Sequence, residues 1–235
     1  MEEWLQSGIR PLDDEMESYL LSRGVTRDLW NDLGLGVWVP PNTNAPDPSF
    51  CKKYGGRGQA LEGNLAIPLR CPRGSIIGLD TREVSTKRIT GYRLPKAKWV
   101  PVWLHRTNAP KRLWEGGRAW VVEGLFDLAA IDRVASYGDA VFATQRAAMT
   151  RAQTRFLSRL CRGGVLIAYD NDEAGKKGTV GWTDAESGRR YYGAIQNLKS
   201  AGVEDVERCL YLGKDPGDVW SSSGDQGLMT NFGRY

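Results

Sequence analysis

The chain has 235 residues, of which 41% are hydrophobic and 26% charged, so it can bury one large core or two smaller ones. Its four cysteines stand far apart and it has a single histidine, which excludes a zinc ribbon, a disulfide framework and a two-histidine metal site. No apolar stretch reaches the length of a membrane span, and the amino terminus is acidic. We therefore expect a cytoplasmic protein with no membrane contact and no zinc.

Two short helices are predicted near the amino terminus. Residues 13–24 and 26–34 each open with an Asp or Thr that can cap a helix, and each ends at a glycine. Residues 39–49 are rich in proline and asparagine and predict a surface loop. Residues 64–70 and 75–84 then predict two antiparallel strands joined by a turn.

The net charge of +4 is distributed unevenly along the chain. Residues 50–118 carry fifteen Lys and Arg against four acids, a balance of +11, which leaves −7 for the remainder. Such a balance favours a surface that meets a polyanion, and a solubilising face is the alternative. The aromatic residues Tyr92, Trp99, Trp103 and Trp114 interleave with these charges and could stack on bases, although packing in the core is the commoner role of tryptophan.

After residue 117 the pattern changes to alternating strands and helices, over residues 119–123, 125–136, 140–144, 150–161 and 165–170. This alternation is typical of βαβ units in a parallel sheet. We therefore divide the chain into a basic α+β subdomain, residues 1–117, and an α/β domain, residues 118–235.

Carboxylates follow the predicted strand ends, where the ligands of open parallel sheets gather. Asp170 and Asp172 lie one residue apart, so in an extended chain they share one side of the pleat and repel by roughly 3 kcal/mol at about 5 Å and an effective dielectric near 20. A proton, a basic side chain or a divalent metal has to compensate. Oxygen ligands suit Mg²⁺ or Mn²⁺. The acids that we expect at this edge are Glu123, Asp127, Asp170, Asp172, Asp215 and Asp218.

Three segments resemble the acidic motifs of a TOPRIM domain: VVEGLFDLAAI, LIAYDNDEAGKKG and GKDPGDVW, in that order. Upstream, YLLSRGVTRDLWNDLGLG, NLAIPLR and SIIGLDTREV are similar to the start of the catalytic core of bacterial and phage DNA primases. The resemblance covers nearly the whole chain. It implies a TOPRIM-type parallel sheet with flanking helices, preceded by a small basic mixed α+β subdomain.

The resemblance also implies a function: synthesis of short RNA primers on single-stranded DNA from ribonucleoside triphosphates, by nucleotidyl transfer that depends on Mg²⁺ or Mn²⁺. It implies a replicative helicase and a separate zinc-binding module as partners. The implied catalytic residues are Glu123, Asp127, Asp170 and Asp172. The implied metal ligands are these four with Asp215 and Asp218, and the implied nucleotide or nucleic-acid contacts are Arg70, Arg82, Lys87, Lys96 and Lys98.

The sequence departs from the primase pattern at two places. The family commonly has an acid directly after the proline, whereas here Gly217 precedes Asp218. Residues 179–190 interrupt the chain after the DxD motif and are expected to form an inserted loop. Two alternatives stay open, a TOPRIM nuclease that cleaves DNA with the same metals and a nucleic-acid-binding protein without catalysis.

Overall fold

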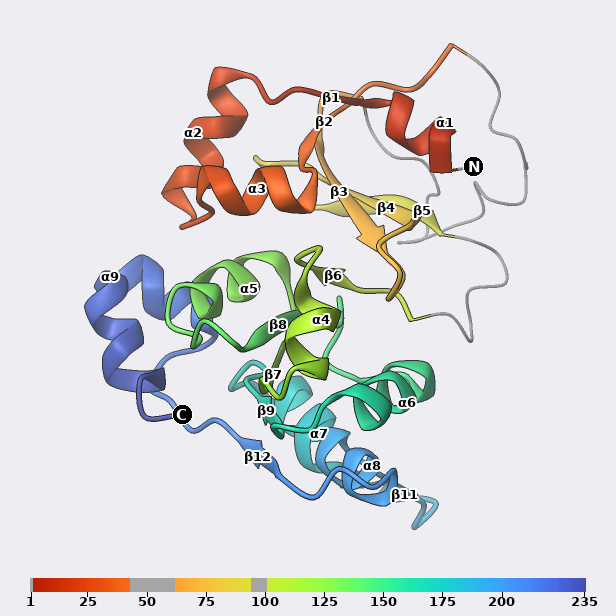
Figure 1. The fold of residues 1–235 in the computed structure, drawn as a ribbon, viewed down its shortest axis with the longest axis vertical. Helices are drawn as coiled ribbons and strands as arrows, with labels where there is room; N and C mark the ends of the chain where they lie inside the picture. The colour runs from red at the N-terminus through yellow and green to blue at the C-terminus, as the bar shows by residue number, and fades with distance from the viewer. Residues whose placement is uncertain (1, 43–61, 94–100) are drawn as a thin grey trace. The chain divides into compact units, whose positions relative to one another are not determined.

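The structure is a computed structural model that describes residues 2–42, 62–93 and 101–235. The chain forms two compact units, Met1–Leu104 and His105–Tyr235, each with its own sheet and core (Figure 1). Lys96, Lys98 and Trp99 lie outside the described residues. Within the described ranges, no helix combines the length and the apolar character needed to cross a membrane.

The first unit is built on a five-stranded antiparallel sheet whose strands are neighbours in chain order. The strands are β1 (Ile9–Arg10), β2 (Gly36–Trp38), β3 (Leu65–Arg70), β4 (Ile76–Arg82) and β5 (Ile89–Arg93). The predicted antiparallel pair corresponds to β3 and β4 and is confirmed. Pro68 lies in β3 beyond the two residues that pair with β2, so its missing N–H costs no hydrogen bond on that side.

Three helices accompany this sheet: α1 (Glu2–Ser7), α2 (Asp14–Ser22) and α3 (Arg27–Leu33). The predicted caps of the second and third helices are confirmed. The Asp13 carboxylate accepts a hydrogen bond from the Met16 N–H at 2.8 Å, and the Thr26 hydroxyl accepts one from the Leu29 N–H at 3.3 Å. Gly34 ends α3 in the left-handed conformation that glycine adopts without strain.

The core of the first unit lies between α1 and the sheet. Leu5, Trp38 and Tyr92 are buried there, and the Trp4 ring meets the rings of Trp38 and Tyr92 edge to face at 5.8 and 5.6 Å. Trp103 is also fully buried. The suggestion that Tyr92 and Trp103 stack on bases is therefore wrong, because both rings belong to the core.

The second unit contains a five-stranded sheet in the order β12-β9-β7-β8-β6. Its strands are β6 (Leu104–His105), β7 (Ala119–Val122), β8 (Ala140–Ala143), β9 (Val165–Ile167) and β12 (Val206–Arg208). β12, β9, β7 and β8 run parallel, which confirms the predicted parallel sheet. The chain passes from β7 to β8 on one side and then crosses to β9 on the other, so the strand order reverses next to β7.

Helices cover both faces of this sheet (Figure 1). α5 (Leu125–Asp132) and α9 (Pro216–Phe232) pack together, while α6 (Arg151–Leu160), α7 (Glu173–Val180) and α8 (Ala194–Ser200) form a second group, and α4 (Ala109–Trp114) contacts β8 and α6. Right-handed crossovers from β7 to β8 and from β9 to β12 run in opposite directions and so place the two groups on opposite faces. The predicted flanking helices are confirmed.

Two details differ from the sequence-based expectation. The compact units divide at residues 104 and 105, and α4 packs on the second sheet, whereas the predicted functional domains divide at residues 117 and 118. That domain division stays a prediction. The expected loop over residues 179–190 instead begins as the end of α7 and continues as a hairpin of β10 (Trp182–Thr183) and β11 (Arg190–Tyr191).

Candidate active site

The candidate site lies at the carboxyl ends of β7 and β9, which are neighbours in the sheet. The chain leaves β7 into α5 on one face and leaves β9 toward α7 on the other. Such a reversal of strand order opens a crevice at the strand ends, the usual ligand position in open α/β sheets. Glu123 directly follows β7, and Asp170 follows β9 after two buried residues.

Glu123 is tied directly to the loop that follows β9. Its Oε1 accepts a hydrogen bond from the Asp170 backbone N–H at 3.2 Å. Burial, and then the charge of Asp170, raises the pKa of Glu123 to about 7, with smaller contributions from Asp172 and Asp215. Without a bound cation, Glu123 therefore holds its proton to a higher pH than an ordinary glutamate does.

Asp127 occupies the first turn of α5, as predicted, and is 8% exposed. Its Oδ2 accepts a hydrogen bond from the Gly124 N–H at 3.0 Å, and its Oδ1 accepts one from the Gly217 N–H at 3.2 Å. Burial, and then the charges of Asp215 and Asp170, raises the pKa of Asp127 well above its usual range. Asp127 thereby joins the loop after β7 to the amino terminus of α9.

Asp170 and Asp172 do not share one side of a strand, so that prediction is wrong. β9 ends at Ile167, and Asp172 instead caps α7, with its Oδ1 accepting a hydrogen bond from the Gly175 N–H at 2.8 Å. Among the described residues, the buried Oδ1 of Asp170 has no hydrogen-bond partner. Burial, and then the charges of Asp215 and Asp172, raises the pKa of Asp170 to about 6, while Lys214 acts in the opposite direction.

Asp215 belongs to the same cluster, whereas Asp218 does not. Asp215 caps α9, and its Oδ1 accepts a hydrogen bond from the Asp218 N–H at 2.7 Å. Its charge raises the pKa of Glu123, Asp127 and Asp170, and Asp218 is not among the main causes of these shifts. The Asp218 side chain is exposed. We define the acidic cluster as Glu123, Asp127, Asp170, Asp172 and Asp215.

Asn171 and Tyr211 hold the loops of the acidic cluster together, and the sequence analysis missed both. The Asn171 side-chain amide donates to the carbonyls of Tyr211 and Gly213 at 3.0 and 2.8 Å. The Asn171 backbone N–H donates to the Lys214 carbonyl at 2.7 Å, and the Tyr211 hydroxyl donates to the Tyr169 carbonyl at 2.9 Å. The sequence offers one signal for this, an asparagine between two aspartates, since short polar side chains bind nearby backbone in turns.

The glycines after the acids are required by close packing of α7. A Cβ atom on Gly175 would lie 2.1 Å from the Asp170 carbonyl oxygen and 2.9 Å from Glu123 Oε1. A Cβ atom on Gly178 would lie 1.7 Å from the Ala147 carbonyl oxygen. These glycines let α7 approach the loop after β9 and the loop after β8. This close packing places Asp172 beside the other acids of the cluster.

The predicted basic contacts are in different environments within the first unit. Arg70 is half-buried: its Nη1 donates to the Gly74 carbonyl at 2.8 Å and its Nη2 to the Leu33 carbonyl at 3.4 Å, and burial lowers its pKa. Arg70 therefore joins the end of α3 to the β3–β4 turn. Arg82 is half-buried at the end of β4, and Lys87 is exposed in the β4–β5 turn with a φ of 58°.

The acidic cluster has the donors for a hard divalent cation but does not enclose one by itself. In the part of the chain that the structure describes, no three His, Cys, Asp or Glu side chains form a ready metal site. Mg²⁺ commonly binds one or two carboxylates and completes its shell with water and substrate phosphates, so an incomplete set fits this ion. The unpartnered Asp170 Oδ1 and the mutual repulsion of the acids support that fit. Lys214, whose Nζ is 3.7 Å from Asp215 Oδ2, compensates only part of the charge.

Comparison with known proteins defines the class of this unit. A family model described as Toprim-like matches residues 120–220, which contain the whole acidic cluster. No curated protein matches the sequence. Residues 120–220 are therefore a Toprim-like domain, and the carboxylates after β7 and β9 lie at its strand ends.

Solved structures extend the likeness to the whole chain. A primase from Aquifex aeolicus, comprising zinc-binding and RNA polymerase domains, is 24% identical with a TM-score of 0.67, over 97% of this chain and 58% of that one. The DnaG primase catalytic domain bound to single-stranded DNA is 18% identical with a TM-score of 0.66, over 99% and 77%. The primase fragment of the bacteriophage T7 primase-helicase protein is 16% identical with a TM-score of 0.56, over 95% and 80%. The chain has the fold of a bacterial- or phage-type DNA primase catalytic core.

Proposed function

We propose that this chain is the catalytic core of a DNA primase, which makes short RNA primers on single-stranded DNA from ribonucleoside triphosphates. One observation carries the proposal: acids from three separate loops, Glu123, Asp170 and Asp215, act on one another at the point where the strand order reverses. The primase-core fold of the whole chain supports it. The chain spans 58% of the length of the Aquifex protein, so the helicase and the zinc-binding module stay predicted partners.

The acids of the cluster have different proposed roles. Asp170, Asp172 and Asp215 would hold Mg²⁺ or Mn²⁺, which when bound neutralises phosphate charge and polarises the phosphoryl group. Asp127 accepts two backbone N–H groups and so positions α9 against the loop after β7. Asp218 is exposed and is proposed only to favour the approach of the cation.

Glu123 is the proposed proton acceptor. In the reaction, the 3′-hydroxyl oxygen of one ribonucleotide bonds to the α-phosphorus of another, and the bond to the β-phosphate oxygen breaks, which releases pyrophosphate. The hydroxyl proton passes to the Glu123 carboxylate, the acid of the cluster that directly follows β7. Because its Oε1 accepts the Asp170 N–H, the carboxylate is fixed beside the phosphate-binding acids.

The proposed template is single-stranded DNA, as in the DnaG catalytic domain of the comparison. Lys87, which is exposed, and Lys96 and Lys98, which lie outside the described residues, are proposed contacts with DNA or nucleotide. Arg82 is proposed to contact the same ligands. Arg70 is engaged by two backbone carbonyls, so we assign it the role of shaping this surface.

The test is an assay of the full chain with single-stranded DNA, labelled ribonucleotides and Mg²⁺ or Mn²⁺. Short labelled oligoribonucleotides are expected, and a parallel reaction with a supplied dinucleotide removes any need for an initiating partner. Asp170→Asn with Asp172→Asn should abolish synthesis while DNA retention stays intact. Glu204→Gln with Glu207→Gln, which removes two exposed acids of the same unit, should retain synthesis.

Three outcomes would contradict the proposal. A shortened template without new oligoribonucleotides would indicate the nuclease. Retardation of DNA with neither product would indicate a binding protein without catalysis. Full synthesis by the Asp170→Asn, Asp172→Asn variant would show that the acidic cluster is not the catalytic site.

A further inference from the structure

The β10–β11 hairpin is a self-contained insertion between α7 and α8. Its two ends meet at Gly181 and Gly193: a Cβ atom on Gly181 would lie 2.8 Å from the Gly193 nitrogen, and one on Gly193 would lie 2.4 Å from the Gly181 nitrogen. The hairpin projects from the second unit (Figure 1). It therefore adds a surface without changing the path of the sheet.

This hairpin presents aromatic rings to solvent. Trp182 and Tyr191 are a direct cross-strand pair whose rings stack at 4.6 Å with an angle of 10° between their planes. They are 38% and 39% exposed, and Tyr192 next to them is 62% exposed. A cross-strand stack stabilises a short hairpin, which accounts for the first two rings. It does not account for Tyr192, which is not part of that pair.

Cations lie over all three rings. Lys177 Nζ lies 5.3 Å from the centroid of Trp182, and the Arg189 and Arg190 guanidinium carbons lie 5.1 and 5.4 Å from the centroids of Tyr191 and Tyr192. Exposed cation–π contacts are worth about 0.5–1 kcal/mol, whereas a base stacked on an aromatic ring is worth about 1–3 kcal/mol. A base can therefore displace such a cation, and the displaced cation is then available for a phosphate.

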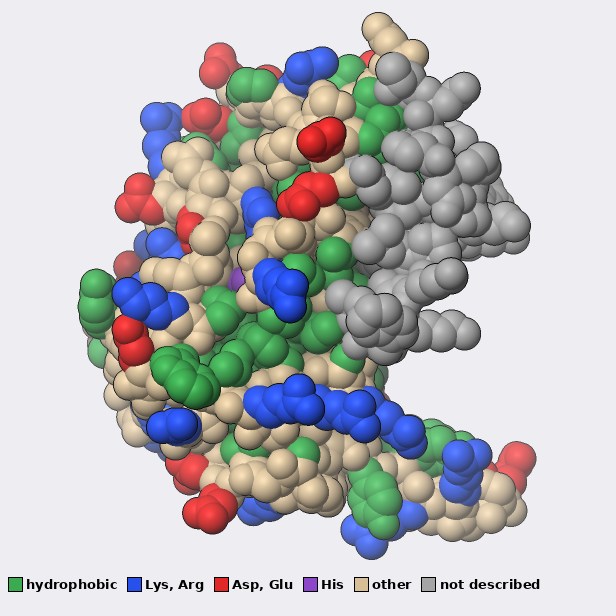
Figure 2. Space-filling view, turned by 45° about the vertical axis from the view of Figure 1, so that its right-hand side comes forward, with side chains coloured by type: hydrophobic (Ala, Val, Ile, Leu, Met, Phe, Trp, Pro, Cys, Tyr) green, Lys and Arg blue, Asp and Glu red, His purple; other side chains and the backbone are tan. Residues whose placement is uncertain are grey.

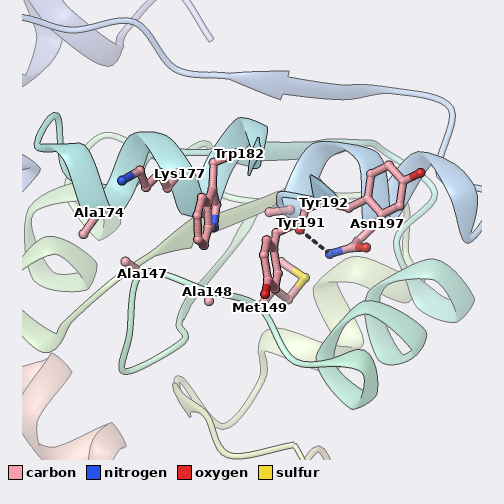
Figure 3. A pocket seen from close by; sticks show the side chains of 11 residues that line it. Ala147, Ala148, Met149, Ala174, Lys177, Trp182, Tyr191, Tyr192 and Asn197 are labelled. Carbon is pink, nitrogen blue, oxygen red and sulfur yellow. Dashed lines mark hydrogen bonds between the residues drawn. The ribbon is translucent and has the colours of Figure 1, made fainter. Parts of the chain in front are cut away.

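A pocket of about 270 Å³ lies between the hairpin and the loop that precedes α6. Trp182 and Tyr191 point from the hairpin toward Ala147, Ala148 and Met149 of that loop (Figure 3). Ligand pockets usually begin at roughly 300 Å³. This pocket therefore suits one planar ring better than a whole cofactor, and Trp182, Tyr191 and Tyr192 are among the residues that line it.

Helix α6, which follows the loop at this pocket, carries a row of exposed arginines. Arg151, Arg155 and Arg159 are exposed and four residues apart, so they lie along one side of the helix over about 12 Å. Residues 151–162 contain four arginines and no acid. Figure 2 shows a row of Lys and Arg side chains on the second unit. The acids on the hairpin side are Glu173, which pairs with Lys177 at 3.3 Å, and Asp184 and Glu186 in the turn.

We propose that the hairpin and α6 form a second binding surface for single-stranded DNA, apart from the acidic cluster. Unpaired bases would stack on Tyr192 and the Trp182–Tyr191 pair, and the arginines of α6 would contact the phosphates that follow. Duplex DNA does not offer free base faces, so the aromatic part selects a single strand. We choose DNA over RNA because the proposed function has a DNA template. Binding to this surface is measured without metal or nucleotides, so a failure of this proposal can be told apart from a failure of primer synthesis.

The first test measures binding of a labelled twelve-residue oligothymidine by fluorescence anisotropy at several salt concentrations, with EDTA present. Arg151→Gln, Arg155→Gln and Arg159→Gln together should reduce the slope of log affinity against log salt by about 2, since each phosphate contact contributes about 0.7 on a single strand. The matched control, Arg10→Gln, Arg27→Gln and Arg234→Gln, removes the same charge from exposed positions outside α6, α7, α8 and the hairpin. An equal change in slope for the control would overturn the proposal.

The second test addresses the aromatic residues. Tyr192→Ala should weaken binding roughly five-fold or more, whereas Tyr192→Phe keeps the ring and should bind like the wild type. Removal of residues 182–192, with Gly181 joined to Gly193, should weaken binding further and leave metal-dependent synthesis on saturating template intact. Unchanged binding by Tyr192→Ala and by the deletion, or tighter binding of oligouridine than of oligothymidine, would refute a DNA surface here.

Discussion

At the scale of single residues, the burial and mutual repulsion of the acids in the acidic cluster lower the stability of the folded protein. Asp170 has a buried carboxylate oxygen without a partner among the described residues, and it is repelled by Asp215 and Asp172. Groups with such strongly shifted pKa values gather at functional sites, because the strain is useful only when a ligand relieves it. Other charges are stabilising, as at Arg133, whose hydrogen bond to Asp225 lowers the pKa of that carboxyl.

Asp170→Asn should therefore stabilise the metal-free protein, and more so at high pH. The pKa of Asp170 is raised to about 6 in the folded state, so its favourable contribution is present in acid and is lost as the pH rises through that value. The variant should exceed the wild type in thermal midpoint near pH 8, keep roughly half of this advantage near pH 5 and lose most of it near pH 4, close to the pKa of an unfolded aspartate. Melting curves in EDTA across this range measure it. An advantage that grows toward acid would contradict the assigned repulsion.

At the scale of elements, α7 shows why glycines follow the paired aspartates. An exposed helix position usually gains about 1 kcal/mol when glycine becomes alanine. At Gly175 the added methyl group would lie 2.1 Å from the Asp170 carbonyl oxygen. Alanine should therefore destabilise the protein at this position, although it usually stabilises a helix. The helix cannot move away without separating Asp172 from the other acids.

Gly175→Ala should lower the free energy of unfolding by about 1–3 kcal/mol, the usual cost of overpacking, and should also reduce the proposed nucleotidyl transfer. Lys176→Ala lies in the same turn with an exposed side chain and should change stability by less than about 0.5 kcal/mol. Urea denaturation of both variants gives the comparison. A stabilised Gly175→Ala protein would show that α7 packs differently from the structure described above.

Elements with local signals could be predicted from the sequence, and those that depend on distant contacts could not. Asp13, Thr26 and Thr150 cap α2, α3 and α6, and each helix was placed within a few residues of its observed bounds. The long helix α9 was missed, because its run of serines and a non-helical Gly224 give no helical period. The hairpin was missed because its strands of two residues are held by the Trp182–Tyr191 stack and not by an alternating pattern.

For the candidate site, strand ends were enough to bring Glu123, Asp127 and Asp170 together, since parallel strands end at one edge. The place of Asn171 between two aspartates indicates a turn residue, but its hydrogen-bond partners could not be predicted, because they lie about forty residues further along the chain. Asp218 was included by its spacing; its side chain is exposed, and its backbone N–H binds the Asp215 carboxylate in the first turn of α9.

At the scale of the whole molecule, the chain consists of two units with separate cores, and the acidic cluster lies in one of them. The first unit carries a core around Trp38 and an antiparallel sheet, and the second carries the parallel sheet and every member of the acidic cluster. A ligand that binds only the folded cluster should stabilise the second unit directly, because binding to the native state adds to its stability.

Mg²⁺ should therefore slow amide hydrogen exchange in residues 105–235 more than in residues 2–42 and 62–93. The protection should be larger near pH 8 than near pH 5.5, because protons on Glu123 and Asp170, with pKa values of about 7 and 6, compete with the cation. The Asp170→Asn, Asp172→Asn variant is the control and should show little protection. Equal protection of both units, or of the variant, would place the cation elsewhere.

The bond between Asp127 and the Gly217 N–H joins residues ninety positions apart. A ribosome must synthesise the chain at least as far as α9 before this clasp can close, so a nascent chain cannot assemble the complete set of acids. Assembly of the acidic cluster therefore waits until translation has reached that helix, and a product that ends before residue 215 would lack both Asp215 and this hydrogen bond.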